Sequence, residues 1–458
     1  MTERLLQPRP QGASCTGTLS GADNKHNLVH NFDLPQGVAE LRVRMTFSPH
    51  VVAGFKNMIP LSLFDPAGFR GAKHCHGTTH EIALSAQAAS PGYLAGPLPA
   101  GRWQVVLDAH VVMSEEPVHY GIEVDFAPTP SLAPQRWAAG PAPQRGPGWY
   151  RGDLHAHTTH SDAAWDVPEL VAWARQQRLD FVTLSDHNTL SGIPHLRALQ
   201  GPDLLTLGGM EFTTFWGHAL MLGVPDWMDW RTENAVGMAA ISRRVQARGG
   251  IFIVAHPRAI GDPYCSGCRW MYDEVFPGPA RMVEVWNADW GGDSNNADGL
   301  ALAFDWLNQG YRMAFTSGTD NHGRVPGLHH GFNHVYAEAL TETALLAALQ
   351  AGHNYISAGP RLTIEARRGT DVVGMGDVLP VGQGHAEVEF AWAHAPAGAQ
   401  LTVYGGKAIR HQGSVPAAGT LRLALDPAEV AWVSATLTER DGRMQALTNP
   451  VFLNPPAR

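Results

Sequence analysis

Lysine is scarce in this chain of 458 residues. Its four copies are Lys25, Lys56, Lys73 and Lys407, so every permanent cation between the last two is an arginine. Acidic residues (42) outnumber basic residues (33), and the formal net charge is −9. This balance argues against nucleic acid as a partner, because binding to long nucleic acids depends on neutralising phosphates. An anion site in the central region has to be built from arginine, metal ions or backbone N–H groups.

Long apolar runs and cysteines are also few. The segment Met1–Pro8 lacks the apolar core of a signal peptide, and no stretch approaches the roughly 20 apolar residues of a membrane span. We therefore expect a cytoplasmic protein with no membrane partner. Cys15 and Cys75 are isolated, while Cys265 and Cys268 form a single CxxC. A structural zinc site needs a second pair of ligands, so we expect two reduced thiols there.

The composition and the turn signals divide the chain into several domains. It is too long for one ordinary hydrophobic core, and 44% of its residues are apolar. Residues 1–125 carry short β-like runs, which predict an N-terminal β-sandwich domain. Residues 126–148 hold six prolines and predict a stiff linker. Residues 359–458 return to β character and predict a small C-terminal β-sandwich domain. In the first domain, His74-Cys75-His76 and His80 look ligand-like, but they lack a carboxylate partner and we expect an ordinary loop.

Residues 149–358 alternate between strand-like and helix-like segments. Asp166-Val-Pro-Glu169 predicts a helix start, since aspartate caps, proline fits the first turn and glutamate completes a capping box. Apolar residues over 181–186 predict the next strand, and a helix over 341–352 stops at a glycine. Such βα units predict a mainly parallel sheet covered by helices. A (β/α) barrel brings ligands from many strands to one face, so we favour it over an open doubly wound sheet.

Nine side chains that can bind metal fall at the ends of apolar runs in this central region. They are His155, His157, Asp162, His187, Glu211, His218, His256, Asp320 and His322. His155 and His157 are two residues apart, which on a strand puts both imidazoles on one face. Each residue alone has an ordinary alternative, such as a turn cap for Asp162 or a surface ion pair for Glu211. Nine together point to a multinuclear site for zinc, manganese, iron or cobalt.

These residues stand in longer motifs. The motifs are Arg151-Gly-Asp-Leu-His-Ala-His-Thr-Thr-His-Ser-Asp162, Ser185-Asp-His-Asn188, Met210-Glu211, Ala255-His-Pro257 and Gly318-Thr-Asp-Asn-His322. They resemble the polymerase and histidinol phosphatase (PHP) superfamily of metallohydrolases. Three further motifs, Phe64-Asp-Pro-Ala-Gly-Phe-Arg-Gly71, Gly92-Tyr-Leu-Ala-Gly-Pro-Leu-Pro99 and Thr448-Asn-Pro450, resemble its carbaryl hydrolase-like (CehA/McbA) branch. The resemblance implies an α/β fold, with a distorted (β/α)7 PHP barrel over 149–358 between the two β-sandwich domains.

The resemblance also implies a centre of two or three divalent metal ions. It assigns the first metal to His155, His157, Glu211 and Asp320. It assigns the second to Glu211, as a bridge, with His218 and His256. It assigns the third to Asp162, His187 and His322. Some relatives use a histidine at the position of His160 as the third-site ligand or as an acid, so both roles stay open for His160.

The expected chemistry is hydrolysis of an ester bond in a small molecule. A hydroxide that bridges two cations is a nucleophile near neutral pH, and the cations stabilise the charge that develops on the attacked oxygen. Either the third metal would hold the leaving oxygen or His160 would protonate it, and Arg258 and Arg324 are candidates for gripping a substrate anion. We expect small phosphoesters, either monoesters or diesters, as substrates. A carbamate or carboxylic ester of the carbaryl type is the alternative. A non-catalytic, metal-stabilised binding protein is the third possibility, disfavoured by so many ligands. Oligomeric state stays open.

Overall fold

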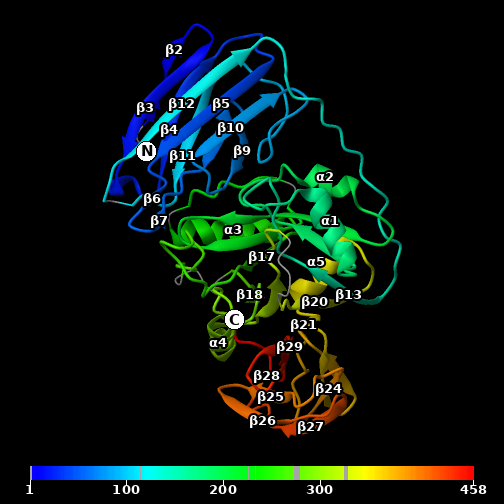
Figure 1. Cartoon of the computed structure of the whole chain (residues 1–458). Coiled ribbons are helices and arrows are strands. Elements are labelled where there is room, and N and C mark those ends of the chain that lie inside the picture. The colour runs from blue at the N-terminus through cyan, green and yellow to red at the C-terminus, as the bar shows by residue number, and fades with distance from the viewer. Residues whose placement is uncertain (1–2, 114, 225, 233, 273–278, 324–328) are drawn as a thin grey trace.

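The computed structural model describes residues 3–113, 115–224, 226–232, 234–272, 279–323 and 329–458. Three parts follow one another along the chain, from the β-rich N-terminal part through a mixed α/β part to a β-rich C-terminal part (Figure 1). The proline-rich segment between β12 (Val118–Ala127) and β13 (Gly148–Asp153) passes along the outside of the middle part. There Trp137 stacks on His195, with ring centroids 3.8 Å apart, and Gly140 donates a backbone hydrogen bond of 2.9 Å to Arg197.

The N-terminal part is a sandwich of two five-stranded sheets. In spatial order, one sheet contains β1 (Glu3–Leu5), β4 (His26–Leu34), β11 (Gly101–Ala109), β8 (Leu61–Asp65) and β9 (Gly68–Lys73). The other contains β10 (Thr79–Ser85), β5 (Glu40–Ser48), β12 (Val118–Ala127), β3 (Gly12–Leu19) and β2 (Gln7–Arg9). A 3₁₀ turn η1 (Gly21–Asp23) and a hairpin of β6 (Val51–Val52) and β7 (Phe55–Lys56) complete it. Buried and exposed residues alternate along β5 and β12, and the buried ones form the core between the sheets.

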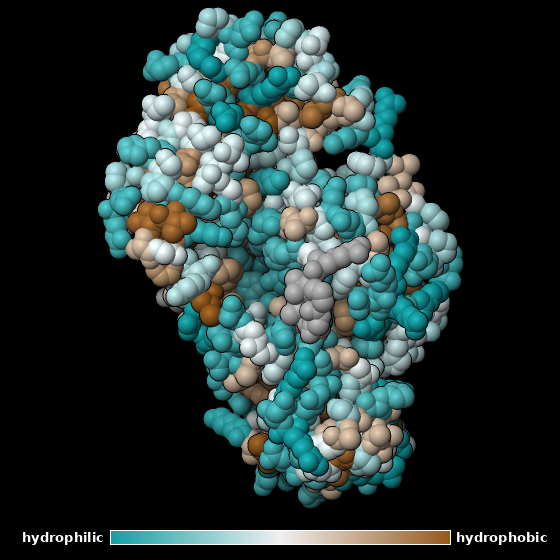
Figure 2. All heavy atoms as spheres, viewed as in Figure 1, coloured by the Kyte–Doolittle hydropathy of each residue, from teal (hydrophilic) through white to brown (hydrophobic). Residues whose placement is uncertain are grey.

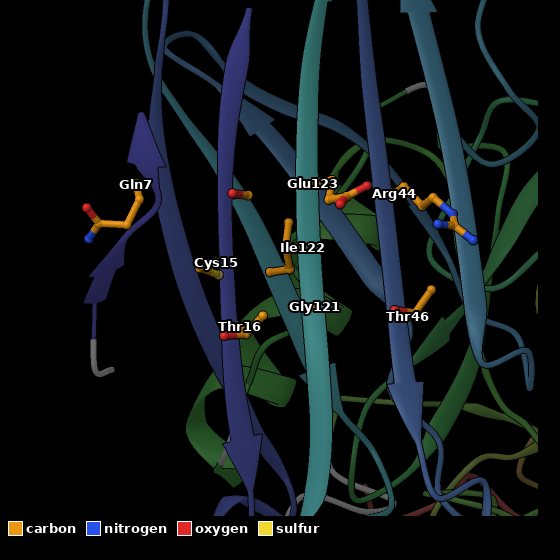
Figure 3. Close-up of a pocket in the computed structure, with 9 residues that line it drawn as sticks. Gln7, Cys15, Thr16, Arg44, Thr46, Gly121, Ile122 and Glu123 are labelled. Atoms are coloured by element: carbon orange, nitrogen blue, oxygen red, sulfur yellow. The ribbon is translucent and has the colours of Figure 1, made fainter. Parts of the chain in front are cut away.

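A shallow groove of 380 Å³ crosses β3, β12 and β5 on the N-terminal sandwich (Figure 3). Small or polar residues such as Ser14, Thr16, Thr46 and Gly121 line it. None of the nine predicted ligands is among its lining residues, so this groove is separate from the candidate metal site.

The middle part is built on a sheet whose strands run in the spatial order β19-β18-β17-β16-β15-β14-β13-β20-β21. The first five of these in chain order are β13 (Gly148–Asp153), β14 (Phe181–Leu184), β15 (Leu205–Thr213), β16 (His218–Leu222) and β17 (Ile251–Val254). The others are β18 (Met282–Asn287), β19 (Ala314–Gly318), β20 (Phe332–Ala337) and β21 (Asn354–Ser357). Its helices are α1 (Val167–Gln176), α2 (Ile193–Ala198), α3 (Ala235–Ala247), α4 (Asn296–Asn308) and α5 (Glu342–Ala351). Strands β14 to β19 are fully buried, as expected for a sheet covered on both faces.

The mixed α/β class is confirmed, but the described strands do not form seven repeated βα units. Strand β16 pairs antiparallel with both β15 and β17, whereas β13–β14–β15 and β17–β18–β19 are parallel. The reason is local: Thr213 pairs directly with His218, and residues 214–217 are too few for the crossover that a parallel connection needs. Among the described strands, β19 pairs on one side only and so ends the sheet, whereas the sheet continues beyond β21.

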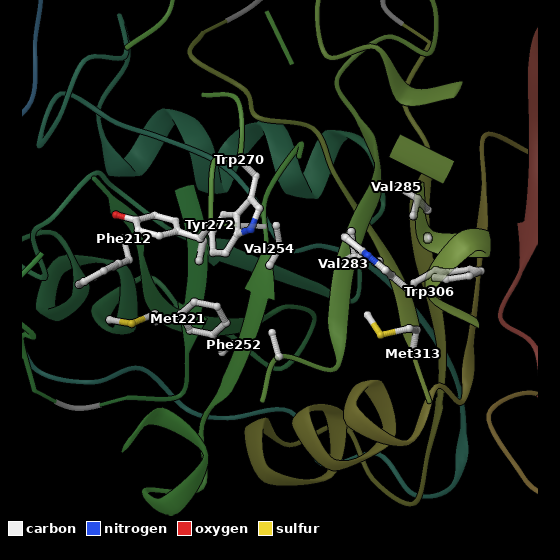
Figure 4. Close-up of a cluster of buried hydrophobic side chains, with 14 of the residues drawn as sticks. Phe212, Met221, Phe252, Val254, Trp270, Tyr272, Val283, Val285, Trp306 and Met313 are labelled. Carbon is white, nitrogen blue, oxygen red and sulfur yellow. The ribbon is translucent and has the colours of Figure 1, made fainter. Parts of the chain in front are cut away.

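The largest apolar cluster fills much of the middle part (Figure 4) and extends to Trp432 and Leu447 of the C-terminal part. Phe212, Met221, Phe252 and Val283 come from four neighbouring strands, and Trp306 of α4 packs in the same cluster. Each of these side chains is at most 5% exposed. The cluster therefore fixes the strands whose ends carry the candidate ligands.

The C-terminal part packs two sheets face to face. A separate four-stranded sheet contains β23 (Asp371–Gly374), β22 (Arg361–Arg368), β24 (Ala386–Ala393) and β27 (Gly419–Leu425). The other strands are β29 (Met444–Thr448), β28 (Trp432–Thr438), β25 (Gln400–Gly405), β26 (Ala408–Ser414) and β30 (Val451–Phe452). These extend the central sheet, because β29 pairs antiparallel with β21. The C-terminal part thus shares its backbone hydrogen bonding with the middle part.

Two helix boundaries follow the sequence signals closely. Asp166 caps α1, and its carboxylate and that of Glu169 form the predicted capping box. Helix α5 is capped by Thr341 and stops at Gly352, whose φ of +84° favours glycine.

Among the described residues, no helix combines the length and the apolar character that crossing a membrane requires.

Candidate metal centre

The nine predicted ligands come together at one end of the central strands. Strand β13 ends at Asp153, so His155 and His157 lie just beyond it rather than within it. Ala156 forms a parallel bridge with Asn321, and this extended pairing leaves both histidines on one side, facing Glu211 and Asp320. Among the described residues these ligands form three groups that share members. Within each group, the ligand atoms lie within 4.8 Å of one another.

The first group contains His155, His157, Glu211 and Asp320. Nε2 of His155 lies 3.2 Å from Oε2 of Glu211 and 3.4 Å from Oδ1 of Asp320. Nε2 of His157 lies 2.9 Å from the same Asp320 oxygen. This is the set that the resemblance assigns to the first metal.

The second group contains His187, Glu211 and His218. Nδ1 of His218 and Nε2 of His256 each lie 3.0 Å from Oε1 of Glu211, and Nδ1 of His187 lies 3.0 Å from Oε2. His256 therefore contacts the shared carboxylate without joining the 4.8 Å group, whereas His187 joins it. The structure thus places His187 between two groups, which the sequence motifs did not suggest.

The third group contains His157, Asp162, His187 and His322. Oδ1 of Asp162 lies 3.1 Å from Nε2 of His322 and 3.6 Å from Nε2 of His187. The His157 ring stacks on each of the other two imidazoles, with centroids 4.4 Å from His187 and 4.3 Å from His322. His157 and His187 therefore link the groups.

The donor set fits cations. Five buried atoms of the candidate ligands have no hydrogen-bond partner among the described residues: His155 Nε2, His157 Nδ1 and Nε2, Glu211 Oε2 and Asp320 Oδ1. Buried polar groups in native proteins are nearly always partnered, so such a concentration of unpartnered ligand atoms indicates a place for ions. Imidazole and carboxylate donors suit zinc, manganese, iron or cobalt.

The charges of the centre support the same conclusion. Burial alone raises the pKa of a carboxyl, but the surrounding histidines hold the pKa of Glu211, Asp162 and Asp320 well below its usual value. Burial acts to lower the pKa of His256 and His322, but neighbouring carboxylates raise it to about 9 and about 10. Buried anions thus require positive charge around them, which divalent cations can supply in place of protons.

A buried carboxylate that sequence reasoning missed orients His155. Glu284 lies within β18, and its Oε1 is 3.1 Å from Nδ1 of His155. Its other oxygen accepts hydrogen bonds from the backbone N–H of His256 and from Nδ2 of Asn287, at 3.1 and 3.0 Å. Such outer partners fix the orientation of a metal-binding histidine. The available signal was a lone carboxylate inside the apolar run Met282-Val-Glu-Val-Trp286.

Backbone carbonyls orient His218 and His256. Nε2 of His218 lies 3.1 Å from the carbonyl of Ser266, and Nδ1 of His256 lies 3.1 Å from that of Cys268. The opposite ring nitrogens are thereby left facing Glu211. Cys265 and Cys268 in this loop are joined as a disulfide, so the expectation of two reduced thiols is wrong for this structure.

Two candidate ligands have unusual backbone conformations. His256 has a φ of +28° and Asp320 a φ of +48°, both in the left-handed region that residues other than glycine seldom adopt. Backbone of this kind concentrates at functional sites, where the surrounding structure holds it in place.

The three residues predicted to act on substrate have separate outcomes. Nδ1 of His160 lies 2.7 Å from Oγ of Ser191, and His160 belongs to none of the three groups found in the described chain. Arg258 follows His256 closely, and its carbonyl accepts a hydrogen bond of 2.9 Å from Asn295. Arg324 lies outside the described residues. The catalytic roles of all three stay predictions.

Comparisons with known proteins find structural likenesses only. No family model and no curated protein matches the sequence. A two-domain protein from Bacteroides vulgatus containing a predicted PHP-like metal-dependent phosphoesterase is 12% identical, with 69% of this chain and 100% of that chain covered and a TM-score of 0.39. A candidate metal-dependent phosphoesterase from Bifidobacterium adolescentis is 16% identical, with 47% and 96% covered and a TM-score of 0.27. An amidohydrolase from Chromobacterium violaceum with bound sulfate is 16% identical, with 38% and 88% covered and the same TM-score of 0.27. We base the function on this chain's own side chains.

Proposed function

We propose that this protein is a metal-dependent hydrolase that cleaves ester bonds in small phosphoesters. One observation carries the proposal: Glu211, only 1% exposed, is shared between two ligand groups and surrounded by five imidazoles. A carboxylate in this position can bind two adjacent ions. A structural metal site needs fewer ligands than this centre has, which favours a catalytic role. Divalent cations held there would supply a nucleophile near neutral pH and would stabilise negative charge on the substrate.

The exposure of the candidate ligands indicates where a substrate enters. The side chains of His155, His157 and Glu211 are at most 1% exposed, whereas those of Asp320 and His322 are 22% and 38% exposed. A substrate therefore approaches from the side of His322. Groups buried behind it are shielded from bulk water, which strengthens their electrostatic effect on a bound anion.

The chain's own residues then have distinct tasks. Glu284 holds His155 in one orientation, and the carbonyls of Ser266 and Cys268 hold His218 and His256. Arg258, close to His256 in the chain, is a candidate to bind a phosphoryl oxygen, because its guanidinium can donate two parallel hydrogen bonds.

The decisive experiment measures metal content together with substrate class. The purified chain is assayed with aryl phosphate monoesters and diesters and with 1-naphthyl methylcarbamate. We expect two or three ions per chain and phosphoester turnover. Glu211→Ala should lower kcat/KM by more than about 100-fold, since changes even to the partners of metal ligands cost 10- to 100-fold. Glu123→Ala, which removes an exposed carboxylate of β12, is the matched control.

Each other outcome changes the proposal in a defined way. Turnover of the carbamate without the phosphoesters would replace the substrate class and keep the metal centre. Wild-type protein without bound metal, or full activity in Glu211→Ala, would refute a metal-dependent hydrolase at this site.

A further inference from the structure

The N-terminal sandwich sits against the loops that carry the metal centre. Nζ of Lys25 lies 2.7 Å from both Oδ1 of Asp262 and Oγ of Ser266, in the loop whose carbonyls orient two candidate ligands. On another side, Oγ1 of Thr189 donates a hydrogen bond of 2.8 Å to the carbonyl of Gly92. Figure 2 shows a hollow with hydrophilic walls between the N-terminal and middle parts. This sandwich is therefore close enough to contribute side chains to the site.

One histidine of the sandwich contacts a candidate ligand directly. His74 follows β9, is 6% exposed, and its ring centroid lies 4.6 Å from that of His187. On its other side the His110 ring lies at the same centroid distance. Nδ1 of His74 is buried with no hydrogen-bond partner among the described residues. A buried, unpartnered nitrogen beside His187 is costly unless it serves the site.

His76 stands two residues further along the same loop and is exposed. Because His74 contacts His187, a member of the third ligand group, His76 two residues away stands at the exposed edge of that group. The same group contains His322, the most exposed candidate ligand, on the side from which a substrate enters.

We propose that the loop His74–His76 of the N-terminal domain forms one wall of the substrate site. In this arrangement a ring N–H of His76 donates a hydrogen bond to an oxygen of the bound ester, and His74 is a positioning residue that supports His187. Imidazole is suited to this task, because it donates a directed hydrogen bond without adding a permanent charge. The inference rests on the proposed function and adds a substrate contact from outside the domain that carries the metal ligands.

The test compares His76→Ala with His76→Gln in the full-length, metal-loaded protein. Loss of a hydrogen bond to a charged oxygen should raise KM for an aryl phosphate by about 10- to 100-fold. We expect kcat within about threefold of wild type, unchanged metal content, and weaker competitive inhibition by inorganic phosphate. Glutamine retains an N–H donor and should restore part of the affinity. His119→Ala, which removes an exposed histidine from β12, should leave KM unchanged.

A second variant tests the buried residue. His74→Gln should lower kcat with little change in KM, because it loosens His187 rather than a substrate contact. If the wild-type protein is active and His76→Ala has the same KM, the inference is refuted and the proposed function still stands. No ester turnover by the wild-type protein would instead refute the proposed function. Equal losses of phosphate affinity in His76→Ala and His119→Ala would assign the effect to the domain as a whole and would also overturn the inference.

Discussion

The N-terminal sandwich contacts the middle part mainly through side chains, whereas the C-terminal sandwich shares a continuous sheet with it. In the first case Phe69 stacks on Trp227, with ring centroids 3.9 Å apart and an angle of 8° between the planes. In the second case β29 pairs with β21, so that Tyr355 lies opposite Thr448. Side-chain contacts allow close fitting around a site, while shared backbone hydrogen bonds make two regions fold together. The comparison predicts that changes on the N-terminal side affect the site more than stability, and that changes on the C-terminal side do the reverse.

The largest expected effect is on the C-terminal side, at Asn449. Its amide accepts a hydrogen bond of 2.6 Å from the backbone N–H of Phe315 and donates to the carbonyls of Phe315 and Asn354, at 3.0 and 2.9 Å. Asn449→Ala should lower the free energy of unfolding by about 2–4 kcal/mol, because these buried groups lose their partner. Denaturant unfolding measures this loss. At low temperature, the Asn449→Ala protein that remains folded should have the wild-type KM. A changed KM without a loss of stability would contradict the comparison.

An intermediate effect is expected on the N-terminal side, at Trp227. Its ring stacks on Phe69, and its Nε1 donates a hydrogen bond of 3.2 Å to the carbonyl of Asn188, next to His187. Trp227→Leu should lower kcat/KM by about tenfold, since an aromatic pair and a hydrogen bond contribute about 1–2 kcal/mol together. Steady-state kinetics provide the measurement. Trp149→Leu removes contacts with Tyr336 and Tyr355 instead and should leave kcat/KM unchanged. Equal losses in both variants would contradict a specific role for the N-terminal contact.

A separate effect concerns pH and the N-terminal domain alone. Burial raises the pKa of Asp108 from its ordinary value of 3.8 to about 7, against the hydrogen bonds from Ser62 and Asn27. Between these two values the folded state binds more protons than the unfolded state, so stability falls as pH rises from about 4 to 7. Asp108→Asn removes this dependence and should be more stable relative to wild type at pH 8 than at pH 4.5. Melting temperatures at the two pH values test this, and an equal difference at both would show that Asp108 does not titrate in this range.

Much of the candidate site could be predicted because its signals are local. Each of the nine ligands is a histidine or carboxylate near the end of an apolar run, and such ends meet at one edge of a sheet. The capping box at Asp166 and the glycine stop at Gly352 are also properties of a few neighbouring residues. The repeated βα units were overestimated, although the short segment between Thr213 and His218 already carried the signal for an antiparallel pair.

The other features depend on residues far apart in the chain. Glu284 orients His155 across a separation of 129 residues, and the residues near Glu284 in the sequence give no sign of this partner. His74 looked ligand-like but had no matching carboxylate nearby, because its neighbour His187 comes from another domain. The sequence by itself determined which side chains can bind metal and where several helices begin and end, since these depend on residue type and short-range spacing. Only the tertiary structure decided which ligands share Glu211, which groups orient them and which domain covers them, because those relations are distances between segments brought together by folding.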